Sequence, residues 1–263
     1  MKLLLIGDVI GKPGRTLVRK YLPGIVEGAR KAGELIFVIA NGENAAGGFG
    51  ITESTASELF NMGVNVITTG NHVWDKKESV QYLPKEDRVL RPLNYPPGTT
   101  PGFGSGVYLI GNLKVGVINL AGRVFMPNFD CPFRTIDPEI EKLGNETSII
   151  IVDFHAEATS EKQAMGFYLD ARVSAVIGTH THVQTADEKI LPGGTAYITD
   201  VGMTGPVWSI IGIKTEMIIR KFLTQMPMKY EVADGEGMFC AVLMDIDEDS
   251  GRAVGIKRLM LTQ

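Results

Sequence analysis

Residues 3–44 read LLLIGDVIGKPGRTLVRKYLPGIVEGARKAGELIFVIANGEN and carry the pattern that decides the fold. Leu3–Gly7 and Leu35–Ala40 are short apolar runs of the kind that form buried strands. Between them, Thr16–Ala32 repeats apolar residues at helical spacing. A strand, a helix and a second strand in this order predict two parallel strands joined by a right-handed crossover.

The segments around this unit contain residues that turn the chain or end helices. Gly11–Gly14 predicts a turn before the helix, and Pro23 predicts an interruption or a kink within it. Ala45–Gly50 is rich in glycine and predicts a loop. A second helix, capped by its first residue, is expected over Thr52–Met62, and a third strand over Val64–Thr69. This alternation predicts an α/β fold with a parallel sheet.

The remainder of the chain adds strands and one more helix. Apolar runs predict strands at Val107–Ile110, Leu113–Leu120, Ile149–Phe154 and Val173–Gly178, the first two as an antiparallel hairpin. The capping pattern of Ser160 and Gln163 predicts a helix over Ser160–Ala171. In the C-terminal third, a second and more antiparallel sheet is expected from Thr195–Thr199, Met238–Asp245 and Ala253–Leu261. Because the chain contains no flexible linker, residues 1–263 are expected to form one α/β domain with two packed sheets.

The composition excludes several classes of function. The chain has 44% hydrophobic and 21% charged residues, as globular proteins do. Its net charge of -4 gives no basic surface for long nucleic acid. No apolar run approaches the roughly 18–20 residues that cross a membrane, and the N-terminus does not resemble a signal peptide, so a cytoplasmic location is expected. Cys131 and Cys240 are too far apart for a metal-binding motif and are expected to be reduced and structural.

Five predicted strand ends carry side chains that bind metals or handle protons, and all four histidines of the chain are among them. The residues concerned are Asp8, Glu43, Asn44, Asn71, His72, His155, His180 and His182. Ligand sites in an open α/β sheet gather at the carboxyl ends of the strands, so the fold can bring these groups together. A single histidine is more often a hydrogen-bonded core residue. Five such clusters together favour a metal centre with two ions.

The chemistry of these donors limits the choice of metal. Asp8 and Glu43 supply carboxylate oxygens, Asn71 supplies an amide oxygen, and three histidines supply imidazole nitrogens. A mixed nitrogen and oxygen set suits Fe, Mn, Zn or Co, whereas Ca prefers oxygen ligands alone. Because such sites follow the availability of a metal as much as its affinity, the donors do not select among these ions.

Five motifs follow one another in a particular order: Gly7-Asp8, Gly42-Glu43-Asn44, Gly70-Asn71-His72, His155 and Gly178-Thr179-His180-Thr181-His182. In this order they resemble the calcineurin-like metallophosphoesterases. The resemblance covers most of the chain and implies a two-sheet αββα sandwich with a dinuclear metal site. The chain departs from the superfamily at two positions. Ile10 stands where the usual Asp-x-His motif has its histidine, and Glu43 replaces the usual bridging aspartate.

Both departures, together with Gly178–Glu188 and Ile198–Pro206, resemble a narrower bacterial family, the YmdB-like di-iron phosphodiesterases that act on cyclic nucleotides. This match runs from Asp8 to the C-terminus. It implies a phosphodiesterase for small cyclic nucleotides, with 2′,3′-cyclic nucleotides as the first choice and 3′,5′-cyclic nucleotides as an alternative. It also implies two divalent or trivalent ions, with iron as the first choice and manganese or zinc as alternatives.

The resemblance further implies which residues bind each ion. One ion would be held by Asp8, Glu43, Asn44 and His182, and the other by Glu43, Asn71, His155 and His180, with Glu43 bridging the two. Asn44 would then fill the place that Ile10 leaves without a ligand. Because an amide is a weaker donor than an imidazole, the first ion is expected to bind less tightly.

His72 is left for catalysis once these ligands are assigned. It directly follows a predicted ligand and should border the phosphate pocket. There an imidazole can give a proton to the leaving alkoxide, while the two ions hold a bridging hydroxide and clamp the phosphate. The alternative is that His72 is a further metal ligand or supports the ligands. Asp75 and Asp153 could each orient a histidine or be solvated carboxylates, and the sequence assigns no role to Asp200 or Thr204.

Three functions are compatible with these residues. The first is the dinuclear-metal phosphodiesterase. A broad-specificity phosphomonoesterase would use the same metal ligands, and a slow-turnover regulatory protein that responds to a nucleotide could also retain them. The expected partner is a small phosphorylated nucleotide, with neither long nucleic acid nor a membrane. A homo-oligomer is allowed, although no feature of the sequence identifies an interface.

Overall fold

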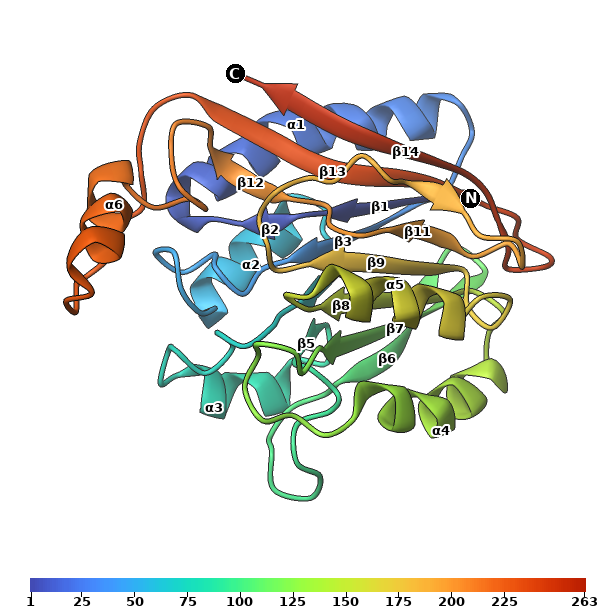
Figure 1. Cartoon of the computed structure of the whole chain (residues 1–263). Coiled ribbons are helices and arrows are strands. Elements are labelled where there is room, and N and C mark those ends of the chain that lie inside the picture. Colours follow the sequence, from blue (N-terminus) through green and yellow to red (C-terminus); the bar gives the residue numbers. More distant parts are fainter.

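Two β-sheets face each other in the computed structural model, which describes residues 1–263 (Figure 1). The first sheet consists of β1 (Lys2–Ile6), β2 (Asp8–Val9), β3 (Ile36–Asn41), β4 (Val66–Thr68), β5 (Val89–Leu90), β12 (Met203–Pro206), β13 (Gly237–Ile246) and β14 (Ala253–Thr262). Its strand order is β2-β12-β13-β1-β3-β4-β5, with β14 paired to β13. The parallel pairing predicted for the first three long strands is confirmed, because β1, β3 and β4 run parallel.

The second sheet has the order β10-β11-β9-β8-β7-β6. Its strands are β6 (Ser105–Ile110), β7 (Leu113–Ala121), β8 (Ile150–His155), β9 (Ala175–Thr179), β10 (Lys189–Ile190) and β11 (Ala196–Ile198). The predicted hairpin is confirmed in the antiparallel pair β6 and β7. The strands β7, β8, β9 and β11 run parallel.

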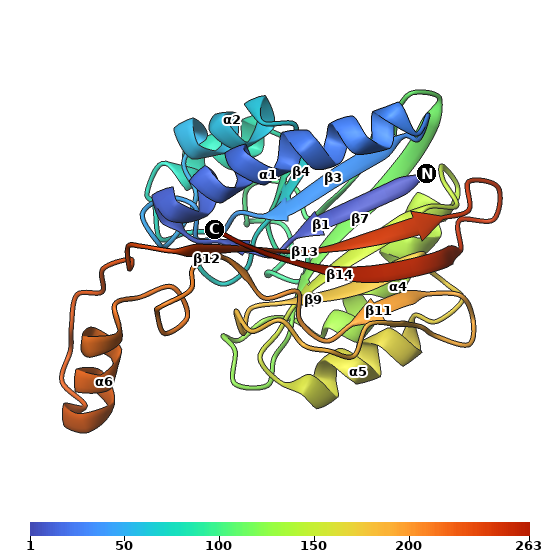
Figure 2. The same ribbon diagram turned by 90° about the horizontal axis from the view of Figure 1, so that it is seen from above.

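The chain forms six helices, most of which cover the outer faces of the two sheets. They are α1 (Gly11–Lys31), α2 (Glu53–Asn61), α3 (Ser79–Tyr82), α4 (Pro132–Gly144), α5 (Thr159–Tyr168) and α6 (Thr215–Thr224), with a 3-10 turn at Leu83–Lys85. In Figure 2, α1 and α2 lie on the first sheet, α4 and α5 lie on the second, and α6 stands away from both. The predicted αββα sandwich is therefore confirmed. No helix has both the length and the apolar character needed to cross a membrane.

Alternate side chains of β1 pack in two different cores. Leu4 and Ile6 pack together with apolar side chains of α1 and α2, whereas Leu3 and Leu5 pack between the two sheets. Successive side chains of a strand point to opposite faces, so a strand that is apolar throughout must be covered on both faces. The short apolar runs of the sequence thus require the layered arrangement.

The predicted grouping of the C-terminal strands is wrong. Met238–Asp245 and Ala253–Leu261 correspond to β13 and β14, which belong to the first sheet. Only Thr195–Thr199, as β11, joins the second sheet, and it pairs there in parallel with β9. Strand β13 pairs with β1 and places Leu243 opposite Leu4. The pattern of apolar residues identifies a buried strand but does not identify its neighbour, because pairing depends on long-range contacts.

The first helix is longer than predicted. Gly11–Gly14 forms its first turn instead of a separate turn. Pro13 is compatible with this position because its missing N–H belongs to the first turn, where no intrahelical acceptor exists. Pro23 lies within the helix and does not end it, so of the two predicted effects of Pro23 the interruption is wrong, and the kink stays a prediction.

The predicted caps had different outcomes. Thr52 caps α2 through reciprocal hydrogen bonds with Thr55, which confirms the predicted start of this helix. Ser160 does not cap α5, because the helix begins one residue earlier, after Ala158 and without a side-chain cap. Helices α4 and α6 were not predicted at all, although Pro132 at the start of α4 is a typical first residue of a helix.

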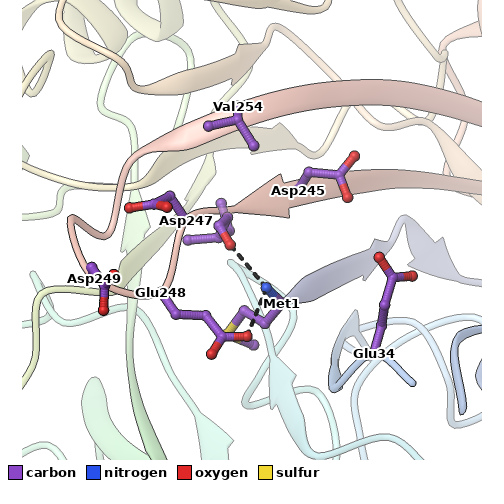
Figure 3. Close-up of a pocket in the computed structure, with 8 residues that line it drawn as sticks. Met1, Glu34, Asp245, Asp247, Glu248, Asp249 and Val254 are labelled. Carbon is purple, nitrogen blue, oxygen red and sulfur yellow. Dashed lines mark hydrogen bonds and ion pairs between the residues drawn. The ribbon is translucent and has the colours of Figure 1, made fainter. Parts of the chain in front are cut away.

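The amino-terminal edge of the first sheet contains an acidic cavity of about 470 Å³ (Figure 3). The Met1 ammonium group donates a hydrogen bond of 2.9 Å to the carbonyl oxygen of Ile246 and pairs with Glu248 at 3.0 Å. These two contacts join the start of β1 to the connection between β13 and β14. The cavity lies at the opposite end of β1 from Asp8, so its carboxylates do not belong to the predicted site.

The two cysteines are unpaired, as expected. Cys240 is buried in β13, and burial raises the pKa of its thiol to about 12. The thiol therefore stays protonated near neutral pH and serves as a small apolar side chain.

Candidate metal centre

All eight predicted site residues lie at one edge of the sandwich. Asp8 follows β1, Glu43 and Asn44 follow β3, Asn71 and His72 follow β4, His155 ends β8, and His180 and His182 follow β9. Each of these strands runs parallel to its partner in the same sheet, so their carboxyl ends point to the same edge. The predicted convergence of strand ends is therefore confirmed as a feature of the fold.

Glu43 is buried at the centre of this cluster. Its Oε1 lies 3.1 Å from Nε2 of His155 and 3.3 Å from Nδ2 of Asn44. Its Oε2 accepts a hydrogen bond of 3.1 Å from the backbone N–H of His72. A single carboxylate thus contacts residues from both predicted ligand sets.

Donor atoms from three strand ends meet around His155. Its Nε2 lies 3.0 Å from Nδ1 of His180 and 3.2 Å from Oδ1 of Asn71. Glu43, His155 and His180 each place a donor atom within 4.8 Å of the other two, which is close enough to hold one metal ion. Two imidazole nitrogens this close require a proton or a cation between them, because their lone pairs otherwise repel each other.

The other predicted ligand set surrounds Asp8, which is buried. Its Oδ2 accepts a hydrogen bond of 3.3 Å from the backbone N–H of His180. Its Oδ1 has no hydrogen-bond donor and lies 3.6 Å from Nε2 of His182, which in turn lies 3.3 Å from the amide of Asn44. A buried carboxylate oxygen without a donor is costly unless a cation or a proton compensates it. The residues around Asp8 therefore fit a metal ion.

Hydrogen bonds at the outer ring nitrogens orient two of the histidines. Nδ1 of His155 lies 3.0 Å from Oγ1 of Thr179, which donates a hydrogen bond of 2.7 Å to Asp153. Nδ1 of His182 lies 2.9 Å from the carbonyl oxygen of Ile211 and donates to it. Both rings therefore present Nε2 to the cluster, as metal-binding histidines with a supporting acceptor commonly do. Asp153 is buried, so it is a supporting group that acts through Thr179 and not a solvated carboxylate.

Glu157 orients the third histidine and was missed by the sequence analysis. Its Oε2 lies 3.2 Å from Nε2 of His180, so this ring turns Nδ1 toward His155. A carboxylate in this position fixes the orientation of a ligand histidine and increases its basicity. The signal in the sequence is an acidic residue two positions after a strand-end histidine.

Burial and charge have opposing effects on these groups. Burial lowers the pKa of His182, but the carboxylate of Asp8 outweighs it and raises that pKa to about 9. Burial, followed by the positive charge of His155, lowers the pKa of His180 to about 3. Burial raises the pKa of Asp153 to about 6. Because a histidine must lose its proton to bind a metal, a metal ion at His182 would displace a proton and would bind more weakly as the pH falls.

Glycines next to the clusters allow the strand ends to approach one another. A Cβ atom on Gly70 would overlap the ring of His155 and the carboxylate of Glu43. A Cβ atom on Gly178 would overlap the carbonyl group of Thr199. Glycine at these two positions is therefore required by the close packing of the site.

His72 faces a cavity of about 640 Å³ that also reaches Glu43 and His182. Its Nδ1 lies 2.8 Å from Oδ2 of Asp75. Asp75 was predicted either to orient a histidine or to be a solvated carboxylate. In the structure it contacts the ring of His72, as the first alternative requires. The second ring nitrogen of His72, Nε2, is left for a molecule bound in the cavity.

A buried ion pair supports the segment that carries His180 and His182. Nζ of Lys162 in α5 lies 2.7 Å from Oδ2 of Asp200, and both side chains are buried. The same oxygen accepts a hydrogen bond of 3.0 Å from the backbone N–H of Thr181, between the two histidines. Asp200 therefore has a structural role, and so does Thr204, whose hydroxyl group exchanges hydrogen bonds with the backbone of Cys240 in β13.

Lys162→Met is expected to lower the free energy of unfolding by about 3–5 kcal/mol, because it leaves the Asp200 carboxylate buried without its cation. Urea unfolding of the metal-free protein measures this difference. Lys142→Met is the matched control, since Lys142 pairs with Glu139 at 2.9 Å but its side chain is 66% exposed. The control should lose less than about 1 kcal/mol. Equal losses in the two variants would contradict the structural role of the buried pair.

Known proteins are similar to this chain over nearly its whole length. The chain matches the model of the family described as YmdB-like protein over residues 4–259. It is 48% identical over 261 residues to the 2′,3′-cyclic-nucleotide 2′-phosphodiesterase of Bacillus subtilis (strain 168), covering 99% of this chain and 97% of that protein. A crystal structure of a hypothetical protein from Thermus thermophilus has a TM-score of 0.92 and 42% identity and covers 100% of both chains. A phosphatase from Mycoplasma pneumoniae has a TM-score of 0.92 and 34% identity, covering 100% of this chain and 93% of that one.

Proposed function

Because the chain belongs to the YmdB-like protein family, we propose that it is a metal-dependent phosphodiesterase that hydrolyses 2′,3′-cyclic nucleotides. The observation that carries the proposal is the convergence of carboxylate, amide and imidazole groups around Glu43. The sequence identity with the Bacillus subtilis enzyme supports the choice of substrate. Since the apolar core between the sheets includes side chains of both, we treat residues 1–263 as one domain.

We assign the ligands to two ions that share Glu43. Asp8, Asn44 and His182 complete one set, and Asn71, His155 and His180 complete the other. Three contacts support this division: Asn44 with His182, His155 with His180, and His155 with Asn71. The nitrogen and oxygen donors suit iron, manganese and zinc alike, and iron is the first choice because the sequence resembles the YmdB-like di-iron phosphodiesterases.

The reaction replaces one phosphorus–oxygen bond by another. When bound, the ions supply Lewis-acid polarisation of the phosphate and a nucleophile derived from water. The oxygen of water bonds to phosphorus, the bond from phosphorus to O2′ breaks, and a 3′-monophosphate is formed. His72 gives a proton to O2′ as this bond breaks. Asp75 holds Nδ1 of His72 at 2.8 Å and so keeps Nε2 toward the cavity.

Purification under anaerobic conditions, with the metal content measured, allows the proposal to be tested. We expect hydrolysis of 2′,3′-cyclic AMP, loss of this activity after chelation, and its return when iron or manganese is added. The parallel substrates are 3′,5′-cyclic AMP and p-nitrophenyl phosphate. A preference for the monoester would favour the phosphomonoesterase alternative. Inactivity on all three substrates with two ions bound per chain would refute the phosphoesterase function.

A further inference from the structure

An apolar wall adjoins the candidate metal centre within the same cavity. Much of this wall comes from the segment between β12 and β13, which carries α6 and stands away from the two sheets (Figures 1 and 2). The side chains concerned are Ile210, Ile211, Ile213, Ile218, Phe222 and Tyr230. A molecule whose phosphate lies among the predicted ligands therefore has an apolar surface available for the rest of its structure.

Three rings form a path from the ligand cluster to this wall. The ring of Phe49 lies edge-on to His72, with centroids 5.2 Å apart and planes at 64°. The ring of Phe49 also lies near that of Tyr230, with centroids 6.3 Å apart and planes inclined by 34°. Phe49 and Tyr230 thus place two tilted aromatic rings beside the proposed proton donor. We call these two side chains the aromatic pair.

Backbone contacts hold Tyr230 next to Phe49. The N–H of Lys214 donates a hydrogen bond of 3.0 Å to the carbonyl group of Glu231, so the segment after α6 pairs with the segment before it. A Cβ atom on Gly48 would lie 2.7 Å from Cγ2 of Val232. The absence of a side chain at Gly48 therefore lets this segment approach the loop that carries Phe49. These contacts place the two rings of the aromatic pair next to each other.

We infer that the aromatic pair, Phe49 and Tyr230, binds the base of the nucleotide substrate. The inference rests on the proposed function, because the phosphate must lie at the ligand cluster for the base to reach these rings. A base offers a flat π-face that stacks on aromatic side chains. Since every base has such a face, the site should accept purine and pyrimidine nucleotides alike, with the strength of stacking setting a modest preference.

The test compares a nucleotide with an analogue that has the same reacting ester and no base. The substrates are 2′,3′-cyclic AMP and methyl ribofuranoside 2′,3′-cyclic phosphate, assayed with the metal-loaded protein. Tyr230→Leu keeps an apolar side chain but removes the ring. We expect its KM for 2′,3′-cyclic AMP to rise roughly 5- to 150-fold, the range for loss of one base–aromatic stack, with kcat little changed. Hydrolysis of the base-free analogue should be unaffected, because this substrate never contacts the ring.

Two further variants control this result. Tyr230→Phe retains the aromatic face and should restore the KM for 2′,3′-cyclic AMP to near the wild-type value. Trp208→Leu removes an exposed ring that belongs to the same segment but does not line the cavity. This variant should hydrolyse both substrates with the wild-type kcat and KM. If Tyr230→Leu affects both substrates equally, or affects neither, the assignment of the base site is overturned. Phe49→Leu provides a second variant should Tyr230→Leu fold poorly.

Failure of the proposed function is recognised separately. If the wild-type protein hydrolyses neither substrate, the phosphodiesterase proposal fails, and the base site is then judged by binding alone. Calorimetry with adenosine 3′-monophosphate and with ribose 3-phosphate supplies that measurement. Tighter binding of the nucleotide, lost in Tyr230→Leu, would support the base site. Equal affinity for the two compounds would refute it.

Discussion

Glu43→Gln is expected to reduce the hydrolysis of 2′,3′-cyclic AMP below about one ten-thousandth of the wild-type rate, beyond the usual loss for one general acid. The proposed ligand sets share this carboxylate, so both ions lose an anionic ligand at once. Glutamine has the same shape and still offers an oxygen to the backbone N–H of His72, which Glu43 now contacts at 3.1 Å. The loss should therefore come from metal binding and not from a disrupted fold.

Metal analysis and unfolding of the metal-free proteins separate these two effects. Burial raises the pKa of Glu43, but the positive charge of His155 and its contact with the carboxylate outweigh burial, so the net shift of this pKa is downward. Glu43→Gln removes this favourable charge, so the metal-free variant should unfold at a lower urea concentration than the metal-free wild type but should still unfold cooperatively. Glu146→Gln is the control, since Glu146 is an exposed carboxylate that pairs with Lys114. A Glu43→Gln protein that binds two ions and turns over normally would contradict the bridging role.

The strand-end residues could be predicted because parallel strands impose a simple rule on the sequence. Each cluster follows an apolar run, and the carboxyl ends of parallel strands share an edge. Asp8 and His155 lie far apart in the chain, yet both reach the same cluster: His155 contacts Glu43, and Asp8 accepts a hydrogen bond from the backbone of His180. The rule needs only the type and direction of each strand, which short apolar runs supply. It does not need the position of β13, so the error in the C-terminal strands left the predicted site unchanged.

The supporting residues could not be predicted because their partners are set by tertiary packing. Glu157 and Asp153 each lie two positions from His155, but this spacing does not decide between a supporting carboxylate and a solvated one until the ring nitrogens of His180 and His155 are placed. The aromatic pair joins Phe49, in a glycine-rich loop, to Tyr230 near the C-terminal strands. Contacts this distant in the sequence leave no periodicity in it. Helix α6 was also missed, since most of its apolar side chains face solvent or the cavity and not a core.

His72→Ala is expected to keep its metal ions and to lose roughly 10²–10⁴-fold in kcat for 2′,3′-cyclic AMP, the range for a general acid. None of the short contacts that join the predicted ligands involves the ring of His72, which pairs instead with Asp75. The ring should therefore be dispensable for metal binding. It should be needed when a poor leaving group, such as the O2′ alkoxide of ribose, must gain a proton.

A substrate with a good leaving group isolates this step. Bis(p-nitrophenyl) phosphate releases p-nitrophenolate, which leaves without a proton, so His72→Ala should lose much less activity on this diester than on 2′,3′-cyclic AMP. Asp75→Asn keeps the ring but weakens the contact that orients it, and its loss on the cyclic nucleotide should be intermediate. Equal losses on both diesters would mean that His72 binds the phosphate instead of donating a proton. Loss of metal from His72→Ala would make it a ligand, because a proton donor in the cavity contributes nothing to metal affinity.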